Sequence, residues 1–197
     1  MPRSHVTALK TRATVALVSL WLLAFTYALR ALSVSLGTVD GGAVVDALRV
    51  VVLVFTACAY LVWFHRAVAI SSVAGCDVRT RPAVAVASWF IPVANLVWPF
   101  MIHYRLLFRS NLGVLAAWAA VWLVGQVTSV LESSVEIARS HPEIEPQLEA
   151  PMASIHWWLS LVGSTLLMIA AGLGALLVGH STRLMTSRLN DLAEDGT

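Results

Sequence analysis

Four long runs of apolar residues alternate with shorter polar stretches along this 197-residue chain. The runs cover residues 13–36, 43–64, 112–131 and 157–178. Each contains about 20 residues or more, which as a helix rising 1.5 Å per residue crosses a hydrocarbon core of about 30 Å. The pattern predicts four transmembrane helices in an all-α integral membrane protein that forms a single domain over residues 1–197.

A fifth apolar segment, residues 83–102, differs from the other four because two prolines interrupt it. Pro92 removes the helical hydrogen-bond partner of the Ser88 carbonyl, and Pro99 does the same to the carbonyl of Asn95. Each half forms a helix of about 13 to 15 Å, which reaches only the middle of a bilayer. We therefore expect a broken, re-entrant segment, and the alternative is a kinked helix that gives five full spans.

The distribution of Lys and Arg favours four spans over five. With five spans, seven basic residues lie on one side of the membrane and four on the other. With four spans, ten lie on the side of the N-terminus and only Arg139 lies opposite. The ten are Arg3, Lys10, Arg12, Arg66, Arg79, Arg81, Arg105, Arg109, Arg183 and Arg188. Because basic loops stay in the cytoplasm, both chain termini are predicted to be cytoplasmic.

Composition agrees with a membrane protein and excludes several functions. The chain is 58% hydrophobic and 12% charged, with a formal net charge of +2, so it lacks the basic surface that binds nucleic acid. Its two cysteines, Cys58 in an apolar run and Cys76 in a loop, have no Cys or His at metal-ligand spacing. No zinc site is predicted.

Three charged residues lie near the predicted membrane boundaries. Arg30 lies near the end of the first apolar run, where a long side chain can snorkel to the headgroups. Asp46 and Arg49 are three residues apart near the start of the second run, close enough to pair on one helix face. This pair is either a self-neutralising pair at the membrane edge or part of a substrate site.

The most polar segment, residues 132–156, is predicted to be an acidic outer loop or a short helical extension. It carries His141, Glu143 and Glu145, with His156 further on. Carboxylates and imidazoles are metal ligands, but alternation in a proline-rich loop imposes no ligand geometry. A solvated acidic loop is the preferred interpretation, and no metal site is predicted.

The stretch after Pro99 mixes apolar and basic residues. This composition suits a helix lying along the inner membrane surface, where His103, Arg105 and Arg109 would contact anionic lipid headgroups. The alternative is a basic loop that flanks the membrane.

The segment "SWFIPVANLVWPF" contains a Trp-x-x-Pro-x-x-Asn-x-x-x-Pro core, formed by Trp89, Pro92, Asn95 and Pro99. It resembles the signature of an uncharacterised bacterial, mainly actinobacterial, family catalogued as domain of unknown function 4328. The aromatic-then-basic end of the second span, with Trp63 and Arg66, is similar to that family as well. The resemblance implies a small multi-pass protein of the bacterial plasma membrane, and it implies no activity.

No catalytic motif is present in the sequence, so we expect no enzyme and no cofactor. Our first hypothesis is a non-enzymatic component of the cell envelope that binds a membrane-protein partner or a second copy of itself, or assists assembly or regulation. Ala171, Ala175 and Gly179, at four-residue spacing, support close helix packing. The second hypothesis is a small transporter or channel subunit that uses residues 83–102, and the third is a protein that binds anionic lipid.

Overall fold

The protein is a bundle of four long helices, and none of the described residues lies in a strand. The computed structural model describes residues 2–36, 42–76, 78–91, 95, 97–107, 112–139 and 146–194. The long helices are α1 (Pro2–Ser35), α2 (Gly42–Ile70), α6 (Leu112–Arg139) and α7 (Pro146–Glu194). All four are long and apolar enough to cross a membrane, which confirms the predicted all-α membrane bundle.

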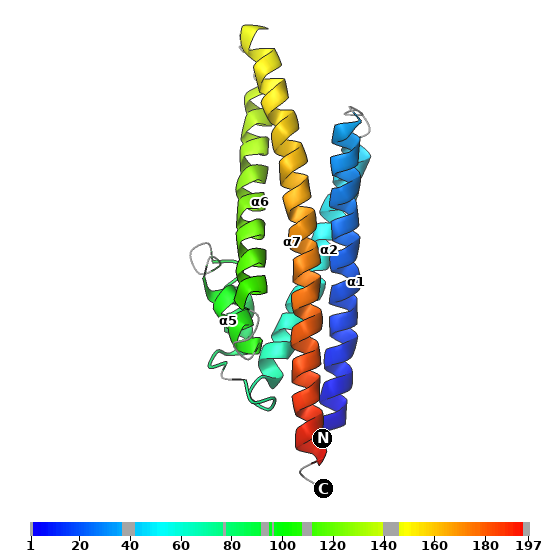
Figure 1. Ribbon diagram of the computed structural model, residues 1–197, viewed down its shortest axis with the longest axis vertical. Helices are drawn as coiled ribbons and strands as arrows, with labels where there is room; N and C mark the ends of the chain where they lie inside the picture. The colour runs from blue at the N-terminus through cyan, green and yellow to red at the C-terminus, as the bar shows by residue number, and fades with distance from the viewer. Residues whose placement is uncertain are drawn as a thin grey trace.

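The long helices are arranged around α7. This helix packs along both α1 and α6, and α1 packs along α2. Both chain termini lie at the same end of the bundle, which we call the terminal end (Figure 1). We call the other end, where α1 finishes at Ser35 and α7 begins at Pro146, the distal end.

The helices continue past the apolar runs, most clearly in α7. With 49 residues, α7 is about 73 Å long, more than twice the thickness of a hydrocarbon core. Its first turns extend beyond the end of α1 (Figure 1). The segment predicted as an acidic outer loop is helical on both sides, since residues 132–139 belong to α6 and residues 146–156 to α7. His141, Glu143 and Glu145 lie outside the described residues.

In the described part of the chain between α2 and α6, the short helices α3 and α5 stand in place of a fifth span. Helix α3 (Pro82–Ala87) has 6 residues and α5 (Trp98–Leu106) has 9, so neither can cross a membrane. Pro99 lies in the first turn of α5, where its missing N–H removes no helical hydrogen bond. Helix α3 packs on α2 and α5 packs on α6. Pro92 lies outside the described residues, and the helix over 83–102 is interrupted as the prolines predict.

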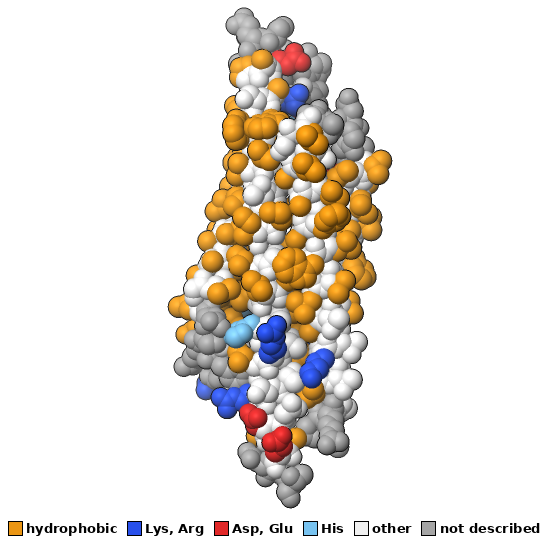
Figure 2. All heavy atoms as spheres, turned by 45° about the vertical axis from the view of Figure 1, so that its right-hand side comes forward, with side chains coloured by type: hydrophobic (Ala, Val, Ile, Leu, Met, Phe, Trp, Pro, Cys, Tyr) orange, Lys and Arg blue, Asp and Glu red, His pale blue; other side chains and the backbone are white. Residues whose placement is uncertain are grey.

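The sides of the bundle are apolar. In Figure 2, apolar side chains form a belt across the middle of the visible face, and charged side chains lie toward the two ends of the bundle. Large apolar side chains of the long helices are well exposed, for example Trp21, Phe25 and Phe55 at 57%, 58% and 56%. Water-soluble monomers rarely expose so continuous an apolar surface. Lipid chains are the solvent that fits it.

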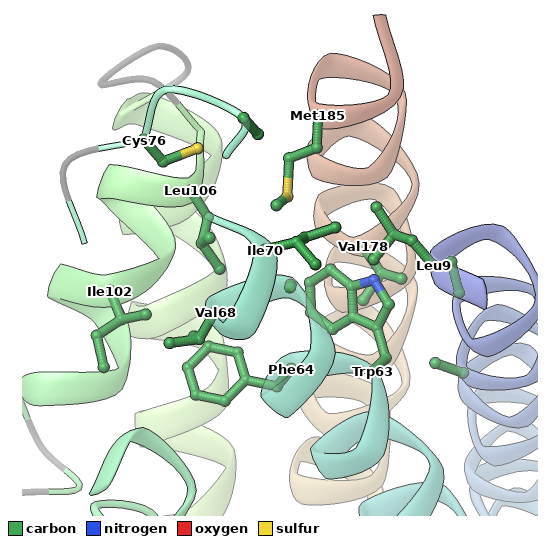
Figure 3. Packing of buried hydrophobic residues seen from close by; sticks show 14 of the residues in the cluster. Leu9, Trp63, Phe64, Val68, Ile70, Cys76, Ile102, Leu106, Val178 and Met185 are labelled. Atoms are coloured by element: carbon green, nitrogen blue, oxygen red, sulfur yellow. The ribbon is translucent and has the colours of Figure 1, made fainter. Parts of the chain in front are cut away.

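The largest cluster of buried apolar residues in the described part of the chain lies toward the terminal end. Trp63 and Phe64 of α2 are fully buried between α5 on one side and α1 and α7 on the other (Figure 3). The Trp63 indole Nε1 donates a hydrogen bond to the Thr182 hydroxyl of α7 at 3.1 Å. Ala171 and Ala175, predicted from their spacing to allow close helix packing, are 5% and 2% exposed.

Candidate functional site: an ionic cavity where four helices meet

Each long helix contributes a polar side chain to one cluster near the distal end. Arg30 of α1 donates hydrogen bonds to the carboxylates of Asp46 on α2 and Glu132 on α6. Ser160 of α7 donates to the same Glu132 carboxylate, and its oxygen lies 3.3 Å from an Arg30 guanidinium nitrogen. The Arg30 and Glu132 side chains are only 14% and 12% exposed. Charges this sheltered need partners, and here each has at least two.

The predicted Asp46–Arg49 pair is present, with 3.5 Å between the guanidinium and the carboxylate. Arg49 also lies over the ring of Tyr27 at 5.8 Å, a cation–π contact. Arg30 differs from the expectation, because it turns inward to Asp46 rather than snorkelling to the headgroups. A carboxylate within reach is a better partner for a guanidinium than water at the membrane boundary.

A second group of ionisable residues borders this cluster on the α6–α7 side. The His156 Nε2 atom of α7 lies 3.4 Å from a carboxylate oxygen of Glu136 and 4.0 Å from one of Glu132. Arg139 lies 3.4 Å from Glu136, one turn away on α6. The two helices are therefore joined by imidazole–carboxylate contacts beyond the end of their apolar runs.

These groups surround a cavity of about 610 Å³, which we call the distal cavity. It is lined by Arg30, Ser33, Val34, Val45, Asp46, Arg49, Glu132, Ser133, Glu136, Ile137, Arg139, Ala153, His156, Trp157 and Ser160. The Trp157 indole donates to the Val34 carbonyl at 2.9 Å, which satisfies one of the carbonyls left open at the end of α1. The volume is in the range of sites that bind small molecules or side chains.

The cavity is lined by three carboxylates and three arginines, and two of the carboxylates are its most exposed charged side chains. The most exposed charged side chains are those of Glu136 and Asp46, at 59% and 40%. The three arginines of the cavity are less exposed, at 14% for Arg30, 25% for Arg49 and 33% for Arg139. A cationic group entering from outside would meet carboxylates first. Among the described residues no three His, Cys, Asp or Glu side chains form a group suited to a metal ion.

The residues singled out around the broken segment form a separate, closed aromatic cluster. His103 of α5 stacks on Phe64 at 4.9 Å between ring centroids and on Tyr60 at 5.9 Å. Trp89 meets Tyr60 edge-on at 5.4 Å, and Trp118 of α6 lies 5.4 Å from His103. This packing fixes α5 against α2 and α6.

His103 is 1% exposed, so the prediction that it contacts lipid headgroups is wrong. Its Nδ1 atom lies 2.8 Å from the Pro99 carbonyl and its Nε2 atom lies 2.6 Å from the Tyr60 hydroxyl. Since a carbonyl only accepts, Nδ1 carries the hydrogen, and Nε2 then accepts from Tyr60. Burial lowers the pKa of His103 to about 4, although the hydrogen bond to Pro99 acts in the opposite direction. The imidazole is a neutral, fully satisfied part of the core.

The other residues of the sequence motifs lie at helix ends or inside the bundle. Arg66 lies 2.7 Å from the His5 Nδ1 atom, which joins the end of α2 to the start of α1. Trp89 Nε1 and the Asn95 side-chain oxygen are buried without a hydrogen-bond partner among the described residues. Arg105 is partly exposed at the end of α5, and Arg109 lies outside the described residues.

Glu132 and Ser160 are site residues that the sequence pattern did not single out, and His156 stood out in it only as a weak candidate metal ligand. The order of charged residues along the chain does point to this cluster. In an up-and-down bundle, the end of the first span, the start of the second, the end of the third and the start of the fourth lie at one membrane face. Arg30, Asp46, Glu132 and His156 occupy those four places in order.

No protein-family model, no curated protein and no solved structure matches this chain. The geometry of the distal cavity is therefore the basis for interpreting its function.

Proposed function

We propose that this protein is a non-enzymatic, partner-binding component of a membrane complex, and that the distal cavity receives a basic segment of the partner. The observation that carries the proposal is the order of exposure in the cavity. Arg30 is engaged inside, whereas the carboxylates of Asp46 and Glu136 are the charged groups most open to an arriving ligand.

The exposed carboxylates are able to exchange partners. Asp46 contacts Arg49 at 3.5 Å and Glu136 contacts Arg139 at 3.4 Å, both between residues one turn apart. Exposed pairs of this kind contribute only about 0–1 kcal/mol each. A Lys or Arg of a partner can therefore compete with Arg49 and Arg139 for these two carboxylates. Arg30, which also donates to Asp46, keeps its second carboxylate partner, Glu132, beneath them.

The shape of the distal end also suits a macromolecular partner. Helices α1 and α2 stop at this end, while α7 continues beyond α1 (Figure 1). The end of α1 and the start of α2 form a floor, and α6 and α7 form a wall that carries Glu136 and the exposed Glu149. A helix end or loop of a second protein can rest on that floor against a wall on which Glu136 is more exposed than the neighbouring Arg139.

The two alternative functions have less support. A transporter built on the broken segment would need that segment to line a wet path. Residues of α3 and α5 line neither the distal cavity nor the groove between α1 and α7 described below. Binding of headgroups at His103 is excluded by its burial.

The proposal includes a topology: the chain resides in a bacterial plasma membrane with its termini in the cytoplasm, its distal end outside, and residues 83–102 re-entrant from the cytoplasmic side. The ten-to-one distribution of Lys and Arg supports it. The resemblance to the family of domain of unknown function 4328 also supports it, and that assignment stays a prediction.

Photo-crosslinking in native membranes tests the proposal. A photoreactive phenylalanine analogue at Ala153, which lines the cavity, should give an adduct with a second protein. The same analogue at the lipid-facing Val51, 66% exposed, should not. In the Asp46→Asn, Glu136→Gln double variant we expect the adduct to fall about tenfold, as for a loss of ~1.4 kcal/mol.

A charge change at the terminal end is the matched control. Asp191→Asn alters an exposed carboxylate of α7 and should leave the adduct unchanged. An adduct that does not depend on Asp46 and Glu136, or one formed only with a second copy of the chain, would refute binding of a basic partner segment.

A further inference from the structure

A second cavity lies between α1 and α7 toward the terminal end, with a volume of about 530 Å³. We call it the terminal groove. It is lined by Lys10, Ala13, Thr14, Leu17, Gly179, Thr182, Arg183, Thr186, Ser187 and Asn190. It shares no residue with the distal cavity, and no function discussed above uses it.

The sequence explains why a groove forms here. Lys10, Thr14 and Leu17 are spaced by four and three residues, so they share one face of α1. The facing positions of α7 carry small or short polar side chains, beginning with Gly179. A Cβ atom at Gly179 would lie 3.8 Å from Leu17, an ordinary contact, so no close backbone approach requires this glycine. The side chains are simply too short to fill the space between the helices.

The charge of the groove has one sign. Lys10 and Arg183 are both exposed, one on each helix, and none of the described residues that line the groove is acidic. Around these cations stand three hydroxyl groups of α7 and the Asn190 carboxamide. All of these groups can donate hydrogen bonds. Two cations surrounded by donors match an anion with several acceptor oxygens.

Thr186 places a buried hydroxyl group at the groove. Thr186 is 8% exposed, yet its Oγ1 atom has no hydrogen-bond partner among the described residues. Helical threonines usually donate to the carbonyl four residues earlier, as Thr14 does to Lys10 at 3.0 Å. A buried, unpartnered hydroxyl that lines a cationic cavity indicates a missing acceptor.

The groove is also fixed in position by the core. Thr182 accepts the hydrogen bond of the buried Trp63 indole, so this part of α7 is held against α2 while its other side faces α1. A site held by such packing needs little rearrangement to bind a ligand.

We propose that the terminal groove binds a phosphate-class anion, with Lys10 and Arg183 neutralising the charge and Thr186 donating a hydrogen bond to one of its oxygens. The anion is either the phosphate of an anionic lipid headgroup or a soluble phosphate compound, because both present the same oxygens. Lys10 lies just before the first apolar run, at a depth that both sources can reach.

Two binding measurements on the full-length protein distinguish the sources. In the first, nanodiscs of phosphatidylcholine are doped with phosphatidic acid, and the lipid retained by the protein is counted by native mass spectrometry. In the second, inorganic phosphate is titrated onto the protein in phosphatidylcholine nanodiscs alone and followed by ³¹P NMR. We expect saturable binding in at least one, weakened about tenfold or more by Lys10→Gln or Arg183→Gln.

Matched variants separate binding from folding. Lys10→Arg and Arg183→Lys keep the charge and should retain most of the binding. Arg12→Gln removes an exposed cation of α1 that does not line the groove and should have no effect. Thr186→Val removes the unpartnered hydroxyl and should weaken binding severalfold without lowering the unfolding temperature. Thr165→Val, elsewhere on α7, should leave binding unchanged.

The proposal fails if neither phosphatidic acid nor inorganic phosphate binds. It also fails if binding is the same in Lys10→Gln, Arg183→Gln and the parent protein, or if Arg12→Gln weakens it equally, since nonspecific attraction to any surface cation would then explain the result.

Discussion

The guanidinium of Arg30 on α1 donates a hydrogen bond to the carboxylate of Glu132 on α6, although α7 lies between these two helices (Figure 1). The contact is made where α7 carries Ser160, a small side chain that is 1% exposed and hydrogen-bonds to Glu132. A bulky residue at that position would separate the charges. The polar side chains of Arg30, Glu132 and Ser160 thus join three helices, α1, α6 and α7.

Removing one member of this group should be costly. Arg30→Met leaves Glu132 sheltered without its cation, and we expect a loss of about 3–5 kcal/mol in the free energy of unfolding. Glu132→Gln keeps an acceptor for Arg30 and should cost less, about 1–3 kcal/mol. Unfolding in mixed micelles of mild detergent and dodecyl sulfate measures both.

The matched control for this prediction is Arg139→Met, which breaks an exposed pair on α6 and should change stability by no more than about 1 kcal/mol. Equal losses in Arg30→Met and Arg139→Met would show that the cluster contributes no more than surface ion pairs.

The Tyr60–His103 hydrogen bond should contribute measurably to the closed aromatic cluster. Tyr60→Phe retains the stacked ring but leaves the His103 Nε2 atom buried without a donor. We expect a loss of about 1–3 kcal/mol in the free energy of unfolding. The control is Tyr104→Phe, at a partly exposed position next to His103 on α5, and it should change the free energy of unfolding by no more than about 0.5 kcal/mol. No difference between the two variants would contradict the assigned hydrogen bond.

Acid should destabilise the protein through His103. Burial holds the pKa of this imidazole at about 4, below its ordinary value of 6.5, so the folded protein favours the neutral ring. Its contribution to stability is therefore complete above pH 6.5 and is lost as the pH falls toward 4, because the unfolded chain binds the proton first.

Unfolding temperatures across this pH range should fall more steeply for the parent protein than for His103→Gln, which has no imidazole to protonate. Parallel curves for the two proteins would show that other groups cause the acid sensitivity.

Two glycines of α6 should respond differently to the same substitution. A Cβ atom at Gly125 would lie 2.9 Å from the buried Leu167 side chain of α7, whereas at Gly113 it would meet nothing within 4 Å. Alanine favours a helix at both positions, but only at Gly125 must α7 move or Leu167 repack. We expect Gly125→Ala to be less stable than Gly113→Ala by about 1–3 kcal/mol, measured by thermal unfolding.

Cysteine labelling on one helix tests the proposed topology. In a Cys58→Ala, Cys76→Ala background, we expect Ser187→Cys to be reached by a membrane-impermeant maleimide only after the cells are opened. Ala150→Cys, also exposed on α7 but near the distal end, should be labelled on intact cells. The reverse pattern would invert the proposed orientation.

The sequence was sufficient to predict the four membrane helices, because apolar length against the thickness of a bilayer is a strong constraint. It was less informative about where the helices end. Polar residues such as those after Glu132 continue a helix in water as readily as they form a loop, and α7 contains Pro151 inside it. The break within residues 83–102 was predictable from Pro92 and Pro99, because a proline removes a helical hydrogen bond from the residue four positions earlier.

The candidate site was less predictable because its members are far apart in the chain. Arg30 and Glu132 were each visible as charges near a span, but their contact depends on which helices are neighbours. His103 was misplaced because its sequence neighbours Tyr104 and Arg105 are typical of a membrane surface. Its burial is caused by Tyr60 and Phe64, which belong to another helix.

One continuous helix carries residues of both cavities. Helix α7 runs from Pro146 to Glu194, with His156 and Ser160 at the distal cavity and Thr182 and Thr186 at the terminal groove. Because α7 is one continuous helix, its two ends are rigidly connected. A displacement of α7 along its axis would therefore move residues that line both cavities at once.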